Sequence, residues 1–240
     1  MKILRFDTCT STNDVLKGEQ GDFIVAVARE QTAGRGQRGN TWISDRGKNL
    51  LFSILVTPEQ LSASDAFVLS QGIALSVCRT VMHYIPEGRV SIKWPNDIYV
   101  DGRKICGILI ENDLQGRHVT RSIIGCGINV NQMSFPDGLA APATSLAIES
   151  GREQSCETVL GEVADEFART YTDICAGHYG PIRERYHEHL LFRGIQARYE
   201  DKEGEFDGII SHVENDGHLI IKDAGDGLRR YAFKEIKLKL

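Results

Sequence analysis

KICGILIENDLQGRHVTRSIIGCGINV, from Lys104 to Val130, is the stretch that decides the fold class of this chain. It contains two strand-like runs, Lys104 to Glu111 and His118 to Val130, both rich in isoleucine and valine. These residues favour strands because their branched side chains pack well on a pleated surface. Gln115-Gly116-Arg117 between the runs is typical of a turn. The stretch therefore predicts an antiparallel hairpin.

The flanking segments extend this hairpin into a larger sheet. Val90 to Trp94 and Ile98 to Val100 are predicted strands, and Asp101-Gly102 is a strong hairpin turn. Further strands are predicted at Ile3 to Phe6, Phe23 to Arg29 and Asn49 to Val56, and helices at Ser11 to Lys17, Ser62 to Ile85, Thr158 to Cys175 and Pro181 to Leu190. We therefore predict an α+β protein with a mainly antiparallel sheet backed by helices.

The sequence after Gly194 has a different texture. Short alternating runs, separated by turns such as Asp216-Gly217 and Asp226-Gly227, predict four or five short strands. This pattern is typical of a small antiparallel barrel. We expect two domains, residues 1–190 and residues 191–240.

Length, charge and cysteine content narrow the class of protein. The chain has 240 residues and a net charge of −5, so it can bury a sizeable core but lacks the basic excess of a dedicated nucleic-acid binder. Its six cysteines form no C-x-x-C pair, which favours free thiols in a reducing compartment. No apolar run approaches the roughly 20 residues of a membrane helix, and no signal-peptide pattern opens the chain. We expect a soluble, cytoplasmic protein.

Gly34-Arg35-Gly36-Gln37-Arg38-Gly39 is a candidate binding loop. Glycine lets backbone N–H groups approach an anion closely, and arginine binds carboxylate or phosphate oxygens in pairs. The loop is not a Walker phosphate loop, because no Gly-Lys-Ser/Thr follows at the required spacing. We expect it to cover a small anionic ligand and to become ordered when that ligand binds. The alternative is a flexible surface loop.

Four further motifs accompany this loop in a fixed order. Ser11-Thr12-Asn13 precedes it, and Lys93-Trp94-Pro95-Asn96-Asp97, the KICGILIE run and Gly125-Cys126-Gly127-Ile128-Asn129-Val130-Asn131 follow it. Each motif is weak alone, but together they closely resemble the biotin protein ligases. The resemblance runs from about Asp7 to Asn131 in motifs.

This resemblance implies a fold and a reaction. The fold would be that of the biotin–lipoate ligases, related to the class II synthetases, followed by a small SH3-like β-barrel. The reaction would be the ATP-dependent adenylation of biotin, followed by transfer of biotin to a lysine of a biotin carboxyl carrier domain of a carboxylase. Only ten residues precede Ser11, so we expect the catalytic type without an N-terminal DNA-binding domain, and no DNA partner.

The resemblance also assigns site residues by matching positions. The catalytic cations match Lys93, Arg35 and Arg38. The biotin contacts match Ser11, Thr12, Asn13, Gln31, Gly34, Arg35, Gly36, Gln37, Lys93 and Gly107, and the ATP or adenylate contacts match Arg38, Trp42, Lys93 and Asn129. Gln37 stands where the family often has arginine, and glutamine donates a hydrogen bond but does not neutralise charge. The alternative for Lys93 is an ordinary exposed lysine at an edge turn.

The chemistry of adenylation agrees with these residue types. A carboxylate and a triphosphate are both anions, so preorganised positive charge is needed and a covalent enzyme nucleophile is not. The ureido ring of biotin offers one carbonyl acceptor and two N–H donors, which hydroxyl and amide side chains complement without charge. Mg²⁺ is expected with ATP, and Asp97 either holds it or caps the Pro-Asn turn. No tightly bound metal is predicted.

Other functions stay open at this point. One is a lipoate or octanoate ligase of the same superfamily, although lipoate has no ureido ring to match Ser11 to Asn13 and Gln31. Another is a non-catalytic module that binds biotin or a nucleotide. The protein is expected to be a monomer or a homodimer. Its C-terminal unit, with Arg229 and Arg230, either helps to receive ATP or the acceptor domain or is a stabilising cap.

Overall fold

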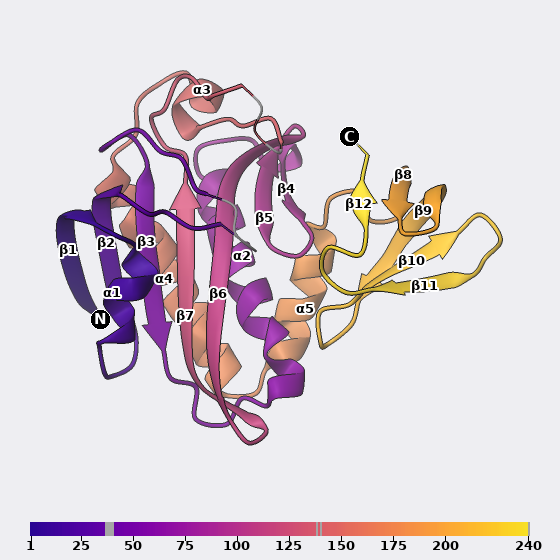
Figure 1. The fold of residues 1–240 in the computed structure, drawn as a ribbon, viewed down its shortest axis with the longest axis horizontal. Helices are drawn as coiled ribbons and strands as arrows, with labels where there is room; N and C mark the ends of the chain where they lie inside the picture. The colour runs from indigo at the N-terminus through magenta and orange to yellow at the C-terminus, as the bar shows by residue number, and fades with distance from the viewer. Residues whose placement is uncertain (37–40, 138, 140, 240) are drawn as a thin grey trace.

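A seven-stranded mixed sheet forms the body of the protein (Figure 1). The structure, a computed structural model, describes residues 1–36, 41–137, 139 and 141–239. The strand order is β1-β2-β3-β7-β6-β5-β4, with β1 paired parallel to β2 and the other pairs antiparallel. The strands are β1 Lys2–Cys9, β2 Ile24–Gln31, β3 Leu50–Val56, β4 Val90–Lys93, β5 Asp97–Val100, β6 Arg103–Gln115 and β7 His118–Ile128. The α+β class and the predicted hairpin at β6 and β7 are confirmed.

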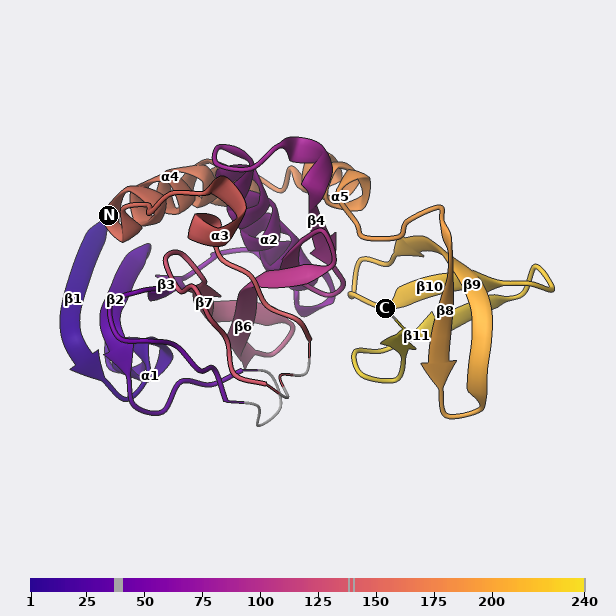
Figure 2. The same cartoon turned by 90° about the horizontal axis from the view of Figure 1, so that it is seen from above.

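Helices cover the two faces of this sheet unequally. The helices are α1 Thr12–Lys17, α2 Phe67–Met82, α3 Leu146–Ser150, α4 Cys156–Cys175 and α5 Tyr179–Glu188. Figures 1 and 2 show α2, α4 and α5 behind the sheet and α1 on the opposite face. Ser11 stands at the N-cap position of α1, but its side chain makes no capping hydrogen bond. No described helix is long and apolar enough to cross a membrane.

Alternation along the strands separates two hydrophobic clusters. On β3, Leu50, Phe52 and Ile54 pack with residues of α2 and α4, whereas Leu55 packs with Leu16 of α1. Successive strand residues point to opposite faces, so a seven-residue apolar strand can serve both clusters. The shallow covering by α1 leaves part of this second face open for a site.

The C-terminal segment forms a separate antiparallel sheet with the order β11-β10-β9-β8-β12 (Figure 2). Its strands are β8 Gln196–Asp201, β9 Gly204–Val213, β10 Leu219–Asp223, β11 Leu228–Tyr231 and β12 Lys237–Leu238. Trp94 joins it to the body: its Nε1 donates to the Gly217 carbonyl at 3.0 Å, and its ring centroid lies 5.7 Å from that of Phe233.

Arg229 and Arg230 are engaged inside this C-terminal sheet. Arg229 Nε donates to Asp223 at 2.9 Å, and Arg230 donates to Glu214 and Asp216 at 2.6 Å each. Paired in this way, they stabilise the unit itself. Their charges are therefore less available to an acceptor domain than the sequence suggests.

Candidate active site

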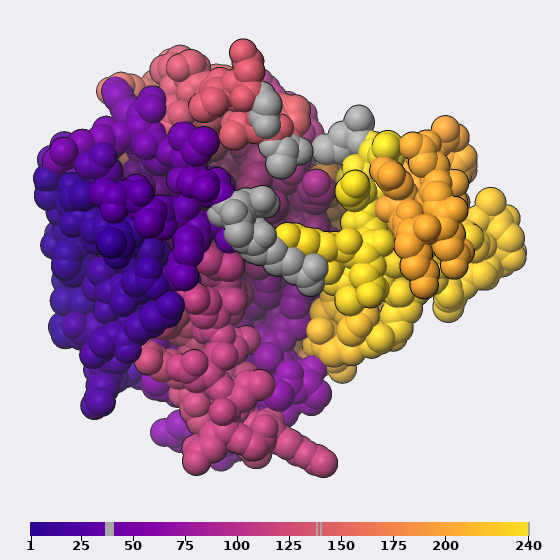
Figure 3. Space-filling model, viewed as in Figure 1, coloured from indigo at the N-terminus to yellow at the C-terminus, as the bar shows by residue number. Residues whose placement is uncertain are grey.

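A cavity of about 550 Å³ opens on the face of the seven-stranded sheet that carries α1. Its size is typical of a small-molecule site. Figure 3 shows this face with the C-terminal unit, in yellow, standing beside it. Many predicted site residues line the cavity: Ser11, Thr12, Asn13, Gln31, Arg35, Gly36, Trp42, Lys93, Gly107 and Asn129. Gln37 and Arg38 lie outside the described residues.

Gly34 is the described site residue that does not line the cavity. Its carbonyl accepts from the Trp42 N–H at 3.0 Å, which closes the base of the loop. A Cβ at Gly34 would lie 2.8 Å from the Trp42 carbonyl oxygen. Its role in the structure is to let the two ends of the loop approach each other.

Glycines on β6 and β7 make the floor of the cavity. Gly107 lies opposite Gly127, and Leu109 lies opposite Gly125. A Cβ on Gly127 would come within 2.5 Å of the Trp42 ring, and one on Gly125 would overlap Asn13 Oδ1. The glycines of the G-C-G-I-N motif are therefore required by side chains that lie directly on the sheet.

Two lysines enter the cavity from β4 and β6, the strands on either side of β5. Lys93, at the end of β4, is half-buried with Nζ 5.2 Å from the centre of the Tyr99 ring. Burial lowers its pKa, because the ammonium loses water. Lys104, on β6, donates to Asp97 Oδ2 at 2.6 Å and lies 5.7 Å from the Trp42 ring. The cavity thus contains two ammonium groups, of which Lys104 is already paired with Asp97.

Lys104 was missed as a site residue by the sequence analysis. The available signal was its place at the head of the KICGILIE run, three residues before Gly107. Asp97 also lines the cavity, but Lys104 already occupies one of its oxygens. Asp97 is the carboxylate among the described lining residues, and it offers at most one side chain to the Mg²⁺ that accompanies ATP.

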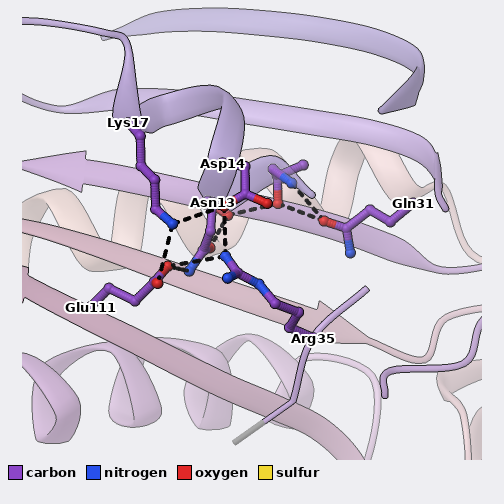
Figure 4. Close-up of polar contacts among 8 residues, drawn as sticks. Asn13, Asp14, Lys17, Gln31, Arg35 and Glu111 are labelled. Carbon is purple, nitrogen blue, oxygen red and sulfur yellow. Dashed lines mark hydrogen bonds and ion pairs between the residues drawn. The ribbon is translucent and has the colours of Figure 1, made fainter. Parts of the chain in front are cut away.

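An uncharged hydrogen-bonding cluster forms one wall (Figure 4). Gln31 Oε1 accepts from the Thr12 N–H at 2.7 Å, and the Thr12 and Ser53 hydroxyls lie 2.6 Å apart. Ser53 also donates to Asn13 Oδ1 at 2.6 Å. Ser53 was not predicted, although a single serine in the apolar strand Leu50–Val56 was the available signal. The cluster suits a neutral ligand group that both donates and accepts.

Arg35 is held by protein carboxylates at the edge of this cluster (Figure 4). Its Nη2 lies 2.8 Å from Asp14 Oδ1 and 3.4 Å from Glu111 Oε2. A hydrogen bond from Lys17, together with the charge of Arg35, lowers the pKa of Asp14. The Arg35 side chain is therefore positioned by the protein before any ligand arrives.

Segments far along the chain complete the cavity. Asn129 is buried and its Nδ2 donates to the Thr144 carbonyl at 3.0 Å. Phe135 and Leu139 line the cavity from the segment between β7 and α3, and Phe233 and Lys234 line it from the C-terminal unit. The last two were not predicted, because no local motif marks them.

One acidic cluster lies outside this cavity. Glu214, Asp216 and His218 bring three possible ligand atoms within 4.8 Å of one another, an arrangement that the sequence did not indicate. Arg230 donates to both carboxylates, so the cluster is already paired with a protein cation.

Fold and site together define the class of protein. Residues 5–129 match the Biotin/lipoate A/B protein ligase family, and the chain belongs to this family. The chain is also similar to several proteins that are named as biotin ligases. It is 31% identical to the bifunctional ligase/repressor BirA of Bacillus spizizenii over 96% of this chain and 71% of that protein.

Two further matches agree. The chain is 30% identical to the biotin–[acetyl-CoA-carboxylase] ligase of Paracoccus denitrificans, over 82% of each protein. Its structure resembles the biotin protein ligase from Aquifex aeolicus in complex with biotin and ATP, with a TM-score of 0.82 and 26% identity, over 99% of this chain and 98% of that one.

Proposed function

We propose that the protein is a biotin protein ligase, which adenylates biotin with ATP and then transfers biotin to a lysine of a carboxyl carrier domain. One observation carries the proposal: a single cavity combines an uncharged donor–acceptor wall, around Thr12 and Gln31, with two lysine ammoniums, Lys93 and Lys104. The wall suits a ureido ring, and the lysines suit a carboxylate that meets a triphosphate.

Adenylation follows from the charge arrangement. A biotin carboxylate oxygen attacks the α-phosphate of ATP, an acyl–phosphate bond forms, and pyrophosphate leaves. Lys93 and Lys104 offset the repulsion between the two anions, and holding both reactants in place supplies up to about 7–11 kcal/mol. In the second step the acceptor lysine amine attacks the acyl carbon, and AMP leaves with the bonding electrons. Asp97 is the residue available to Mg²⁺ bound with ATP.

We further propose a division of the chain at about Leu190, into residues 1–190 and 191–240. Two observations support it: the large sheet and α1 to α5 all precede this point, and the C-terminal strands pair with one another, with no bridge to the large sheet among the described residues. The six cysteines are free, which supports a cytoplasmic location. Either a monomer or a homodimer is compatible with this proposal.

The test measures the two half-reactions separately. Purified protein with biotin, ATP and Mg²⁺ should release pyrophosphate, and adding a carrier domain should then yield a biotinylated lysine. Labelled lipoate in place of biotin is the competing substrate. Release of pyrophosphate with lipoate but not biotin would make the protein a lipoate ligase, and biotin binding without release would make it a non-catalytic module.

A further inference from the structure

A chain of hydrogen bonds leads from Glu111 on β6 to the wall of the cavity (Figure 4). Asn13 Nδ2 donates to Glu111 Oε2 at 2.7 Å, and Ser53 donates to Asn13 Oδ1 at 2.6 Å. The Ser53 and Thr12 hydroxyls are 2.6 Å apart, and the Thr12 N–H donates to Gln31 Oε1. Asn13, Ser53 and Thr12 are almost fully buried, so these bonds do not exchange freely with water.

Glu111 determines the direction of this chain. An ionised carboxylate only accepts hydrogen bonds, so Asn13 must turn its NH₂ group toward Glu111 and its oxygen toward Ser53. Ser53 then donates its single hydroxyl hydrogen to Asn13 Oδ1. The single Thr12 hydroxyl hydrogen then lies between two acceptors, Ser53 Oγ at 2.6 Å and Gln31 Oε1 at 3.0 Å. The Thr12 lone pairs remain available as acceptors.

The other end of the chain is fixed by a backbone group. The Thr12 N–H only donates, so Gln31 must turn its oxygen toward Thr12 and its NH₂ group away from it. Thr12 Oγ1 thus faces the cavity as an acceptor and Gln31 Nε2 as a donor. This is a defined pattern that a ring with both N–H and carbonyl groups can match.

We propose that Glu111 is a positioning residue for the ligand ring: its carboxylate, which does not line the cavity, fixes the donor–acceptor pattern that Thr12 and Gln31 present to biotin. The inference rests on the proposed function. Without the acceptor-only carboxylate, the Asn13 amide can turn over, and Ser53 then donates to Thr12 Oγ1. The Thr12 hydrogen goes to Gln31 Oε1, so Thr12 loses a lone pair that it otherwise offers to the ligand.

The competing explanation is that Glu111 only pairs with surface cations. Its side chain is 33% exposed and lies 3.5 Å from Lys17 and 3.4 Å from Arg35. Asp14, however, lies closer to both, at 2.9 Å from Lys17 and 2.8 Å from Arg35. The Asn13 NH₂ group, in contrast, donates to Glu111. Mutation can therefore separate the role of Glu111 toward Asn13 from its pairing with surface cations.

The decisive experiment exchanges the two polar groups. Glu111→Gln and Asn13→Asp should each raise the biotin Kd and KM by roughly tenfold, the effect expected from one misdirected buried hydrogen bond. The double variant restores the pattern: glutamine at 111 donates to aspartate at 13, whose other oxygen still accepts from Ser53. Its biotin Kd should return to within about threefold of wild type. The proposal would be overturned if the biotin Kd of the double variant rose by the product of the two single fold-increases, as for independent effects.

Controls separate this role from ion pairing and from folding. Lys17→Gln removes a surface partner of Glu111 and should leave the biotin Kd unchanged; if it weakens binding as much as Glu111→Gln does, ion pairing is the cause. Binding is measured by calorimetry without ATP, so it does not depend on turnover. If Glu111→Gln does not fold, the Asn13→Asp variant and the double variant are compared instead. A lower biotin Kd in the double variant than in Asn13→Asp still shows the rescue. Loss of biotin binding by the wild type itself would refute the proposed function, whereas intact wild-type binding without rescue refutes this inference alone.

Discussion

At the scale of single residues, the site depends on a few charges held in unusual surroundings. Lys93 is half-buried beside the Tyr99 ring, and burial lowers its pKa. A buried ammonium is costly until an anion pairs with it, so part of the binding energy of an anionic substrate comes from relieving this cost. Lys104 differs, because Asp97 already pairs with it.

Lys93→Met should abolish adenylate formation and preserve the fold. Methionine keeps the aliphatic stem but removes the charge that offsets two converging anions. A loss of about 3–4 kcal/mol of transition-state stabilisation corresponds to a several-hundred-fold slower reaction. Pyrophosphate release measures the rate, and the thermal midpoint reports the fold. A variant that turns over within about tenfold of wild type would show that Lys93 has no catalytic role.

The lowered pKa of Lys93 predicts a pH dependence. The ammonium form is present at neutral pH and is lost as the pH rises through the lowered pKa, below the ordinary lysine value of 10.5. The rate of adenylation should therefore begin to fall at a lower alkaline pH than it would with a lysine of ordinary pKa. Lys93→Arg keeps the charge, because the pKa of guanidinium is above ~12, so its alkaline limb should move to higher pH. An unchanged limb in this variant would assign the titration to another group.

At the scale of elements, the face shared by β6 and β7 is shaped by missing side chains. Gly107, Gly125 and Gly127 leave room for Trp42 and Asn13 to lie directly on the sheet. Glycine weakens a strand interior, because it has no side chain to pack and loses more entropy on folding. The strands keep these residues because any larger side chain would displace the walls of the cavity.

Gly125→Ala should impair biotin binding more than stability alone explains. The added Cβ overlaps Asn13 Oδ1, so Asn13 must leave its place between Ser53 and Glu111. We expect a biotin affinity at least about tenfold weaker and a loss of about 1–3 kcal/mol in the free energy of unfolding. Calorimetry and denaturant unfolding measure the two quantities.

The matched control is Gly161→Ala on α4, where the added Cβ meets nothing within 4 Å. This change should stabilise the helix by up to about 1 kcal/mol and leave biotin binding unaltered. Equal biotin affinity in the Gly125→Ala variant and the wild type would show that Asn13 is not needed where the structure places it.

At the scale of the whole molecule, the C-terminal unit contributes to the lining of the cavity. Trp94, next to Lys93, donates to the Gly217 carbonyl and packs on Phe233. Residues of both sheets belong to one continuous hydrophobic cluster. The two units therefore pack as one body at the cavity, and Lys234 reaches its lining from the second unit.

Lys234→Ala should weaken ATP binding selectively. An exposed ammonium at the cavity attracts a polyphosphate by about 1 kcal/mol, so the KM for ATP should rise by roughly fivefold while the KM for biotin stays constant. Lys202→Ala, in the turn between β8 and β9 of the same unit, is the control and should change neither constant. Steady-state kinetics, with ATP and biotin varied in turn, measure the two KM values. An equal rise in both constants would indicate a stabilising role for the C-terminal unit.

Much of the fold was predictable because its signals are local. Branched apolar residues predict β3, β6 and β7, and helical periodicity predicts α4. Such patterns are informative because side chains return to the same face of a strand or helix with a fixed period. The two-residue strand β12 escaped prediction, since a strand so short has no period of its own. Ser11 stands at the N-cap position of α1 without a capping hydrogen bond from its side chain, and this residue lines the cavity.

The sequence by itself determined the α+β class, the order of the motifs and ten of the residues that line the cavity, because these properties reside in short contiguous stretches. Only the tertiary structure decided which side chains meet. Ser53 and Lys234 belong to no motif that names them as site residues, Lys104 belongs to a motif that did not identify it as one, and Glu111 lies 98 positions from Asn13 along the chain. Their contacts depend on the register of β3, β7 and β6 and on the docking of a second sheet. The strand register and the docking of the second sheet are set by the packing of the whole molecule, because a short stretch of sequence does not determine which distant residues it contacts.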